Sequence, residues 1–278
     1  MTELPRTEAL YLDLMKKCLT RSIFPERWRP YRPKPKRRLR GALVAALQRV
    51  LAHEDLELVR RARVDPAARA SGAYRHPDCE TMLGLQRLGN LERCVIDVLR
   101  WKVPGDLIET GVWRGGAVIF MRAILAAYGA SDRTVWVADS FRGLPPPDPA
   151  KYPADLGDLH YTKQQLAIPI EEVKRNFERY GLLDDQVRFL AGWFSDTLPT
   201  APIDRLAIVR LDGDMYSSTI DALRPLYPRL SPGGYLIVDD FGLAGCRAAV
   251  EDYRREHGIS EKIIAIDSSA AYWQKSPS

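Results

Sequence analysis

The sequence predicts an α/β protein with a parallel central sheet, a C-terminal antiparallel hairpin and an N-terminal helical extension. Two observations predict this architecture. From residue 105 onward, short apolar runs alternate with segments in which apolar residues recur every three or four positions, a pattern typical of strands joined by crossover helices. Before residue 100 the helical period stands alone, so that part of the chain is expected to be helical.

The expected elements follow in order from these two patterns. Helical spacing before the sheet marks Ala42–Leu51 and Leu85–Leu99. Short runs of apolar residues then mark five strands, at Asp106–Thr110, Val135–Asp139, Val187–Ala191, Leu206–Leu211 and Tyr235–Val238. Helices are expected between them, at Ala117–Tyr128, Glu171–Tyr180 and Ser218–Arg229, and a last hairpin at Lys262–Ile266 and Ala271–Gln274. An alternation of this kind is Rossmann-like.

These patterns divide the chain into three parts. A basic N-terminal segment (1–40) precedes a helical cap or oligomerisation region (41–104), and the α/β domain takes 105–278. Within that domain, the stretch from about 144 to 169 is proline-rich and long for a crossover loop. Loops of this length are usually lids or binding loops, so we expect a lid there.

The net charge of +5 is divided unevenly along the chain. Residues 1–50 hold 13 Lys and Arg against 4 Asp and Glu, whereas the remainder holds 28 against 32, so the basicity belongs to the N-terminal segment and peaks at 27–40. One interpretation is an arm for nucleic acid or an anionic surface. No zinc finger or RNA-recognition signature accompanies it, which favours a solvated or subunit-packing segment and disfavours nucleic acid as a partner.

Cysteine spacing and hydropathy exclude several classes. The four cysteines form no C-x-x-C pair, which argues against a zinc site or a disulfide framework and suits reduced thiols in a cytoplasm. The first residues are charged and give no sign of a signal peptide. The most apolar window, Ala117–Tyr128, contains Arg122 and is too short to span a bilayer, so no membrane association is expected.

The first predicted strand ends in an acidic-x-Gly-x-x-x-Gly turn made by Glu109, Gly111 and Gly115, with Trp113 inside it. Ligands of open α/β sheets bind at this end of the strands, where glycines let the backbone pass close to them. A dinucleotide turn, G-x-G-x-x-G, instead leaves a helix N-terminus bare for a pyrophosphate. S-adenosylmethionine has no phosphate, and an acidic side chain suits its ammonium and sulfonium charges, so the turn favours this cofactor.

Two later strand ends complete the predicted cofactor site. Asp139 ends the second strand, where an acidic residue can accept both ribose hydroxyls of a nucleoside. Ser140 and Phe141 follow it, and the Phe141 ring could form a wall for the adenine. The residues expected beside the base after the third strand are Gly192, Trp193 and Phe194.

Carboxylates end the fourth and fifth strands. Asp212 follows one, and Asp239 and Asp240 follow the other; the strand–helix–strand spacing should bring them to one sheet edge. Clustered carboxylates repel each other unless a cation lies among them. A hard divalent ion, Mg²⁺ for preference, would resolve this and lower the pKa of a substrate hydroxyl. The alternative, that these residues and Asp214 cap the following helices, covers only one Asp per cluster.

Together these motifs resemble the macrocin O-methyltransferase family, which modifies deoxysugars on macrolide and aminocoumarin antibiotics. The resemblance runs from about residue 75 to the end and is carried by segments 81–88, 108–116, 139–145, 180–184, 192–199, 211–216 and 238–240. It implies the class I methyltransferase fold. It also implies an S-adenosylmethionine- and Mg²⁺-dependent O-methyltransferase of secondary metabolism. The implied acceptor is a sugar hydroxyl of a small natural product.

The resemblance also assigns roles to residues. It makes Asp212, Asp239 and Asp240 metal ligands and implies that Asp212, or a neighbouring group, takes the proton from the acceptor hydroxyl. It further implies homodimers or larger assemblies formed through N-terminal helices. Related catechol methyltransferases carry a lysine where this chain has Met215 and usually an asparagine where it has Asp240. A sugar hydroxyl is less acidic than a phenol, so an extra carboxylate as base is sensible. Candidates for acceptor contacts are Met82, His160 and Tyr216.

Other interpretations stay open at this point. The same class of enzyme could act on a phenol, catechol or amino group of a natural product, which the loop at 144–169 would decide. A nucleic-acid-binding or RNA-modifying protein would use the basic N-terminus and show steeply salt-dependent binding. An NAD-dependent oxidoreductase is disfavoured by the missing G-x-G-x-x-G turn, and a catalytically inactive scaffold by the intact acidic and glycine motifs.

Overall fold

The computed structural model describes residues 7–23, 28–31, 38–61, 65, 67–68, 72–73 and 76–276. Half of the basic run at 27–40, namely 27 and 32–37, lies outside these described residues. None of the described helices is long and apolar enough to cross a membrane.

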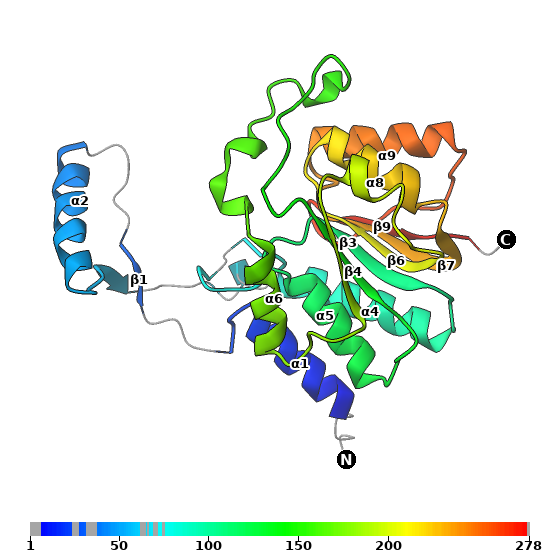
Figure 1. Cartoon of the computed structure of the whole chain (residues 1–278), viewed down its shortest axis with the longest axis horizontal. Coiled ribbons are helices and arrows are strands. Elements are labelled where there is room, and N and C mark those ends of the chain that lie inside the picture. The colour runs from blue at the N-terminus through cyan, green and yellow to red at the C-terminus, as the bar shows by residue number, and fades with distance from the viewer. Residues whose placement is uncertain are drawn as a thin grey trace.

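A seven-stranded sheet forms the centre of the protein, in the order β5-β4-β3-β6-β7-β9-β8 (Figure 1). The strands are β3 (Asp106–Thr110), β4 (Val135–Asp139), β5 (Val187–Ala191), β6 (Leu206–Leu211), β7 (Leu230–Val238), β8 (Ile264–Ala265) and β9 (Ala271–Gln274). The first five are parallel, whereas β9 runs antiparallel to both β7 and β8. The predicted parallel sheet with an antiparallel C-terminal hairpin is therefore confirmed.

Predicted and observed boundaries agree closely, with one informative exception. The strands β3 to β6 match the prediction residue for residue, but β7 begins at Leu230 and not at Tyr235. Pro232, Gly233 and Gly234 indicate a turn by composition, yet they are carried inside the strand, where the register between β6 and β7 shifts. Gly233 has a φ of 82°, a left-handed conformation suited to such an irregularity.

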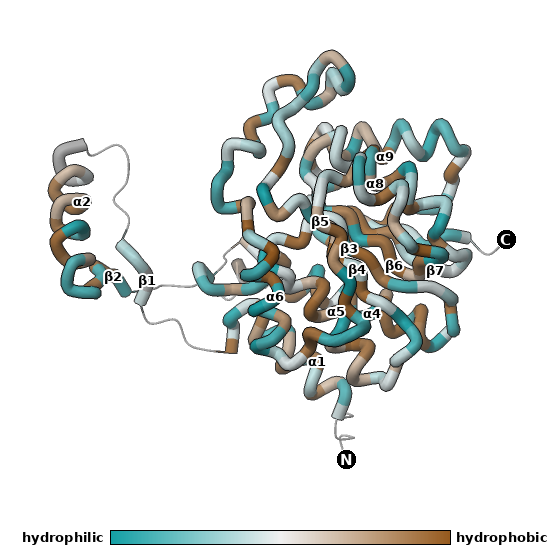
Figure 2. The backbone as a smooth tube through the Cα atoms, in the orientation of Figure 1, coloured by the Kyte–Doolittle hydropathy of each residue, from teal (hydrophilic) through white to brown (hydrophobic). Residues whose placement is uncertain are grey.

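Two helical layers cover the sheet. On one face lie α1 (Thr7–Leu19), α4 (Leu85–Arg100), α5 (Gly116–Ala127) and α6 (Ile170–Arg179), and on the other α8 (Tyr216–Leu226) and α9 (Ala244–Glu256) (Figures 1 and 2). The helix α5 is apolar almost all round because other helices and the sheet enclose it. Where a helix was predicted in these layers, its ends differ from the observed ones by at most three residues. The helix α8 ends at Leu226, two residues before Pro228, which has no backbone N–H to continue the helical hydrogen bonds.

Most of the described residues before 101 are helical, as predicted, but their helices do not all form a separate cap. The helix α1, within the predicted N-terminal segment, buries Leu12, Met15 and Leu19 in the same core as α5. The helix α4 packs on the sheet through β6 and β7. The division of the chain into segments 1–40, 41–104 and 105–278 stays a prediction.

A small arm lies apart from these layers (Figure 1). It consists of α2 (Arg38–His53), which contains the predicted helix Ala42–Leu51, and of the antiparallel pair β1 (Trp28–Pro30) and β2 (Val59–Arg61). The basic run at 27–40 therefore contains a strand, β1, because β2 supplies backbone partners from beyond α2. Along α2, an apolar stripe is exposed, at Leu43, Leu47 and Val50.

The long segment predicted as a lid rises from the body beside α6 and α9 (Figure 1). It contains three short 3-10 turns, η1 (Pro153–Asp155), η2 (His160–Thr162) and η3 (Gln164–Leu166). Two contacts fasten it to α8: the Tyr152 hydroxyl donates to Asp221 Oδ1 at 2.7 Å, and Asp155 accepts from the amides of Tyr216 at 2.7 Å and Ser217 at 3.0 Å. A lid residue therefore caps α8.

This finding decides against the capping alternative for the acidic cluster. The helices α8 and α9 begin after Met215 and Leu243, and neither cap residue makes a side-chain cap bond. The side chain that satisfies the first amides of α8 is Asp155, not Asp214. None of the strand-end carboxylates Asp212, Asp239 and Asp240 therefore serves as the cap of α8.

We expect Asp155→Ala to lower the free energy of unfolding by about 1–2 kcal/mol, because two amides at a helix N-terminus lose a buried acceptor. Urea unfolding followed by circular dichroism measures this. Asp148→Ala, which removes an acceptor from an exposed turn, is the control and should change stability by less than about 0.5 kcal/mol. Equal effects of the two variants would contradict the assignment of Asp155 as the cap of α8.

Candidate active site

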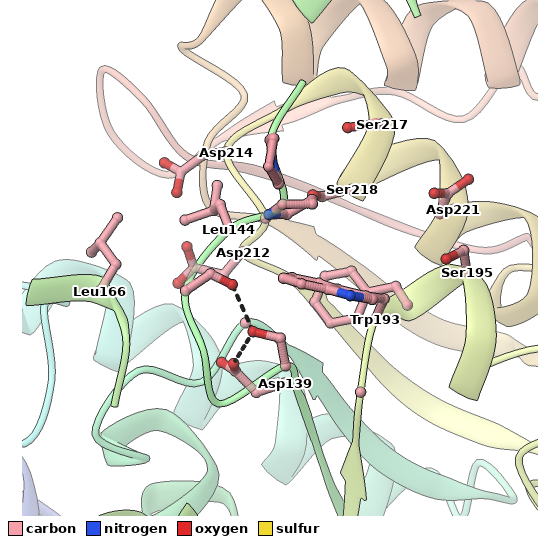
Figure 3. Close-up of a pocket in the computed structure, with 18 of the residues that line it drawn as sticks. Asp139, Leu144, Leu166, Trp193, Ser195, Asp212, Asp214, Ser217, Ser218 and Asp221 are labelled. Carbon is pink, nitrogen blue, oxygen red and sulfur yellow. Dashed lines mark hydrogen bonds between the residues drawn. The ribbon is translucent and has the colours of Figure 1, made fainter. Parts of the chain in front are cut away.

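A cavity opens at the carboxyl ends of β3 to β6, and Figure 3 looks into it. Most of the predicted cofactor residues line it. They are Gly111, Trp113, Asp139, Ser140, Gly192, Trp193, Phe194 and Asp212. The lid and α8 supply the rest of the wall, including Leu144, Lys151, Tyr152, Ser217, Ser218 and Asp221, none of which the sequence singled out.

The turn after β3 requires its first glycine. Gly111 has a φ of 87°, and a Cβ built there would lie 1.8 Å from the backbone oxygen of Asp212. This close approach brings the β3 and β6 ends together at the cavity floor. Trp113, with a φ of 49°, donates its indole N–H to the backbone oxygen of Gln165 at 2.9 Å, so the turn also holds the lid.

Asp139 is oriented by the backbone around it. Its Oδ2 accepts from the amide of Val112 at 2.8 Å, and its Oδ1 accepts from the amide of Phe141 at 2.7 Å. Burial raises the pKa of Asp139, and these amide bonds oppose the rise. Ser140 Oγ also lies 3.5 Å from Oδ1, and Asp139 lines the cavity, where its carboxylate is available to accept hydroxyl groups from a ligand.

Three predicted cofactor residues do not line the cavity. Phe141, at a φ of 56°, packs its ring 6.2 Å from that of Phe189 and belongs to the core around α5. Gly115 is needed for packing, since a Cβ there would lie 2.8 Å from Val173 Cγ1 of α6. Glu109 is buried beneath the turn, where it pairs with Arg210. The structure therefore places these residues in supporting positions.

A second pocket adjoins the first and shares Met82, Trp113, Leu166, Asp212 and Asp214 with it. Figure 3 shows Leu166 and Asp214 on the opposite side of Asp212 from Trp193, which is the side of this second pocket. Its other walls include Asp239, Asp240, Arg87, His76, His160 and Lys163. The two spaces meet at Asp212, so two ligands could approach each other there.

The three predicted metal ligands come together in this second pocket. Asp212, Asp239 and Asp240 each offer an oxygen, and these oxygens all lie within 4.8 Å of one another. The register explains the meeting, because Leu211 and Val238 are paired neighbours at the ends of β6 and β7. The three carboxylates therefore meet at one sheet edge, as the strand–helix–strand spacing predicted.

Arg210 is a buried cation beneath this cluster that the sequence did not reveal. It lies on β6 opposite Glu109 of β3, and its guanidinium pairs with Glu109, with Asp239 and, at 2.9 Å, with Asp212 Oδ2. Arg87 of α4 binds the other oxygen of Asp239 and holds Asp267 at 2.6 Å. Two arginines, Arg87 and Arg210, therefore contact the carboxylate cluster. The only sequence signal for Arg210 was a charged residue within a central strand.

Negative charge still exceeds positive charge in the described part of the site. Burial and the neighbouring Asp239 raise the pKa of Asp212 to about 7, and burial raises that of Glu109 to about 8. Burial, followed by the Asp212 and Asp214 carboxylates, raises the pKa of Asp240 well above its ordinary value. The arrangement therefore favours the arrival of a further positive charge.

The three candidates for acceptor contacts have different positions. Met82 and His160 line the second pocket. Tyr216 does not line either pocket: its hydroxyl donates to Asp252 Oδ2 at 3.1 Å, and its ring lies 5.8 Å from that of Tyr152. Among the described residues, the walls of the second pocket thus include parts of the lid, of the β6–α8 loop and of the segment before α4.

The fold and the site define a class I methyltransferase. Dinucleotide-binding Rossmann sheets are parallel throughout in their usual form, whereas here the reversed strand β9 is inserted beside β7. The chain belongs to the macrocin O-methyltransferase family: the model described as macrocin-O-methyltransferase (TylF) matches residues 8–275. It is an O-methyltransferase, as the resemblance implied.

Similar proteins support this assignment over nearly the whole chain. A mycinamicin III 3''-O-methyltransferase from Micromonospora griseorubida is 47% identical over 270 residues, 96% of each chain. An 8-demethyl-8-(2,3-dimethoxy-alpha-L-rhamnosyl)-tetracenomycin-C 4'-O-methyltransferase from Streptomyces olivaceus is 50% identical over 266 residues, 95% of this chain and 92% of the relative. The structure of the O-methyltransferase NovP matches with a TM-score of 0.82 at 45% identity, covering 97% of this chain and 100% of that chain.

Proposed function

We propose that this enzyme transfers the methyl group of S-adenosylmethionine to a sugar hydroxyl of a glycosylated natural product, with Mg²⁺ as metal cofactor. The observation that carries the proposal is the meeting of two pockets at Asp212, one with a nucleoside-type lining and one with clustered carboxylates. The names of the two relatives support the acceptor class, since one names a rhamnosyl group and 4'-O-methylation, and the other names 3''-O-methylation of mycinamicin III.

The first pocket takes the cofactor in this proposal. Asp139, already oriented by two amides, accepts the ribose hydroxyls, and Trp193 and Phe194 pack beside the adenine. Gly111 and Trp113 line the end of the pocket that adjoins Asp212. The methyl group would then lie at the junction with the second pocket, where an acceptor hydroxyl can align with it.

The donor set fits Mg²⁺. Carboxylate oxygens are the ligands that hard divalent cations prefer, and three carboxylates converge within 4.8 Å. Five carboxylates surround the site, from Glu109, Asp212, Asp214, Asp239 and Asp240, against two arginines, one of which also pairs with Asp267. Burial and, after it, the neighbouring carboxylates raise the pKa values of Asp212 and Asp240, and a divalent ion would oppose both effects by favouring the ionised carboxylates.

When bound, Mg²⁺ would act as a Lewis acid that makes an acceptor hydroxyl easier to deprotonate. The residues of this chain would do the rest. Asp212, Asp239 and Asp240 hold the ion, and Arg210 keeps Asp212 and Asp239 in place. Trp113 of the turn after β3 and Leu166 of the lid line both spaces and help to exclude water from the junction.

Titration calorimetry with S-adenosylhomocysteine, followed by methylation assays, tests the proposal. We expect micromolar binding, and Mg²⁺-dependent mass gain of one methyl group on mycinamicin III or on the rhamnosylated tetracenomycin named for the second relative. Transfer to a catechol or an amine, but to neither glycoside, would assign the alternative acceptor class. Absence of S-adenosylhomocysteine binding would refute the cofactor assignment.

For Asp139→Ala, we expect S-adenosylhomocysteine affinity to fall by about 1.5–3 kcal/mol, the usual scale for hydrogen bonds to a charged group. Calorimetry measures the change. Asp196→Ala is the control, because Asp196 lies beside the cavity on α7 (Phe194–Thr197) but does not line it. Unchanged affinity in Asp139→Ala would remove this residue from the ribose site.

The prediction of a homodimer or larger assembly is retained as part of this proposal. The exposed stripe at Leu43, Leu47 and Val50 of α2 supports it, because an apolar helix face usually contacts another surface. Light scattering of the purified chain measures the assembly directly. A cytoplasmic location also stays a prediction; the four cysteines are free in the structure, which agrees with a reducing compartment.

A further inference from the structure

The two pockets share a wall that includes Met82 and Trp113. Trp113 belongs to the turn after β3, whereas Met82 belongs to the segment before α4, so the wall is assembled from two separate parts of the chain. A displacement of either side chain would change both pockets at once. The alignment of an acceptor with the methyl group therefore depends on the contacts that hold these two parts together.

Arg114 holds the first part of this wall. It follows Trp113 in the turn and packs its guanidinium on the Trp113 ring, with Cζ 4.6 Å from the ring centroid. A cation over the face of an indole is attracted by the ring, which restricts the rotation of both side chains. The indole N–H of Trp113 binds the lid at Gln165, so Arg114 and the lid together orient this ring.

The same guanidinium holds the second part of the wall, the segment before α4. Its Nη1 donates to the carbonyl oxygens of Pro77 at 2.6 Å and Cys79 at 3.1 Å. The next carbonyl oxygen, that of Glu80, accepts from the amide of Gly116 at 2.9 Å, so the backbones of the turn and the segment are also joined. Met82 follows two residues later and is therefore positioned by these contacts.

The helix α6 keeps Arg114 itself in place. Asn176 Nδ2 donates to the backbone oxygen of Arg114 at 2.9 Å, and Glu172 Oε1 lies 3.5 Å from its Nε. A planar guanidinium with partners in several directions has one preferred orientation. Arg114 is thus a fixed link between the turn that lines the cofactor cavity and the segment that lines the second pocket.

We propose that Arg114 is a positioning residue that makes acceptor binding depend on the bound cofactor. A cofactor in the first pocket restricts the turn at Gly111 and Trp113, and Arg114 passes this restriction to the wall around Met82. An acceptor then meets a wall that is already ordered and loses less conformational entropy on binding. Linkage requires that the acceptor tighten cofactor binding by the same factor. The inference rests on the proposed cofactor site.

Calorimetry of the full chain with Mg²⁺ measures this coupling as the ratio of the acceptor dissociation constants without and with S-adenosylhomocysteine. For the better of the two glycosides we expect a ratio of about tenfold or more, a usual size for coupling between two sites. In Arg114→Met the ratio should fall to within about threefold of unity, because both links are lost. S-adenosylhomocysteine alone should still bind this variant, since Gly111 and Asp139 remain.

Two further variants separate this role from a general effect on the fold. Arg114→Lys keeps a charge near Trp113 but lacks the planar fork, so its coupling should be smaller than that of the unmodified enzyme. This variant carries the test if Arg114→Met does not fold. Arg93→Met is the matched control: Arg93 also packs on an aromatic ring, Tyr272 at 5.5 Å, but lines neither pocket, so its coupling should be unchanged.

Hydrogen–deuterium exchange tests the inference without an acceptor. In the unmodified enzyme, S-adenosylhomocysteine should slow exchange of the amides in segment 77–83 by about tenfold, because local opening of that segment becomes rarer. In Arg114→Met the same ligand should leave exchange in this segment unchanged, although it still protects the turn after β3.

Three results would overturn the inference: no coupling in the unmodified enzyme, coupling retained in Arg114→Met, or exchange in segment 77–83 of the unmodified enzyme that does not respond to S-adenosylhomocysteine. If S-adenosylhomocysteine binds but neither glycoside does, the proposed acceptor class fails instead, and the exchange experiment alone decides. If S-adenosylhomocysteine does not bind the unmodified enzyme, the proposed cofactor site fails and the inference falls with it.

Discussion

Replacing Asp240 by alanine is expected to lower methyl transfer at least about 10³-fold while S-adenosylhomocysteine binds with unchanged affinity. Asp240 offers an oxygen to the three-carboxylate cluster, does not line the cofactor cavity, and its other described contact is the amide of Asp214. Losing a metal ligand removes several kcal/mol of charge stabilisation in the transition state, which corresponds to this loss of rate. Single-turnover kinetics and calorimetry with Mn²⁺ measure the two effects separately.

Asp212→Ala and Asp239→Ala should lose turnover to a similar degree, but each also removes one of the three carboxylates that pair with Arg210, so Asp240 gives the cleaner test. Excess EDTA should abolish the activity of the unmodified enzyme, and Mg²⁺ should restore it. Asp204→Ala, at a 97% exposed side chain, is the neutral control. Full activity in EDTA, or an active Asp240→Ala enzyme, would end the metal hypothesis.

The second large effect is expected on stability. Arg210→Met should lower the free energy of unfolding by about 3–5 kcal/mol, because it removes the cation shared by Glu109, Asp212 and Asp239. Glu109 is 1% exposed, and its Oε2 already has no hydrogen-bond partner among the described residues. Without Arg210, that carboxyl group has to be buried uncompensated or protonated.

Chemical unfolding at neutral pH measures this change, with the midpoint and slope fitted together. Arg205→Met is a matched control, because Arg205 directly precedes β6, the strand that carries Arg210. The ion pair of Arg205 with Asp204 is exposed, so the free energy of unfolding of this variant should change by less than about 0.5 kcal/mol. A cost at Arg210 as small as that at Arg205 would show that the buried network contributes little to stability.

The catalytic geometry could be predicted as far as it depends on strand ends. Asp139, Asp212, Asp239 and Asp240 each follow a recognisable strand, and parallel strands end at one edge of a sheet. Side-chain direction was harder to predict. Phe141 and Glu109 belong to the same motifs as true cavity residues, but a left-handed backbone turns Phe141 into the core, and Glu109 faces Arg210 beneath the turn.

By itself, the sequence determined the five parallel strands, three of the helices between them, the α/β class and the acidic edge of the sheet, because hydrophobic period and strand-end chemistry are local properties. The tertiary structure alone decided which groups surround those carboxylates. Arg87 and Asp267 come from distant segments, Asp155 reaches α8 across the lid, and the β1–β2 pair joins residues on both sides of α2. Contacts between distant segments depend on how the layers pack, which no local pattern encodes.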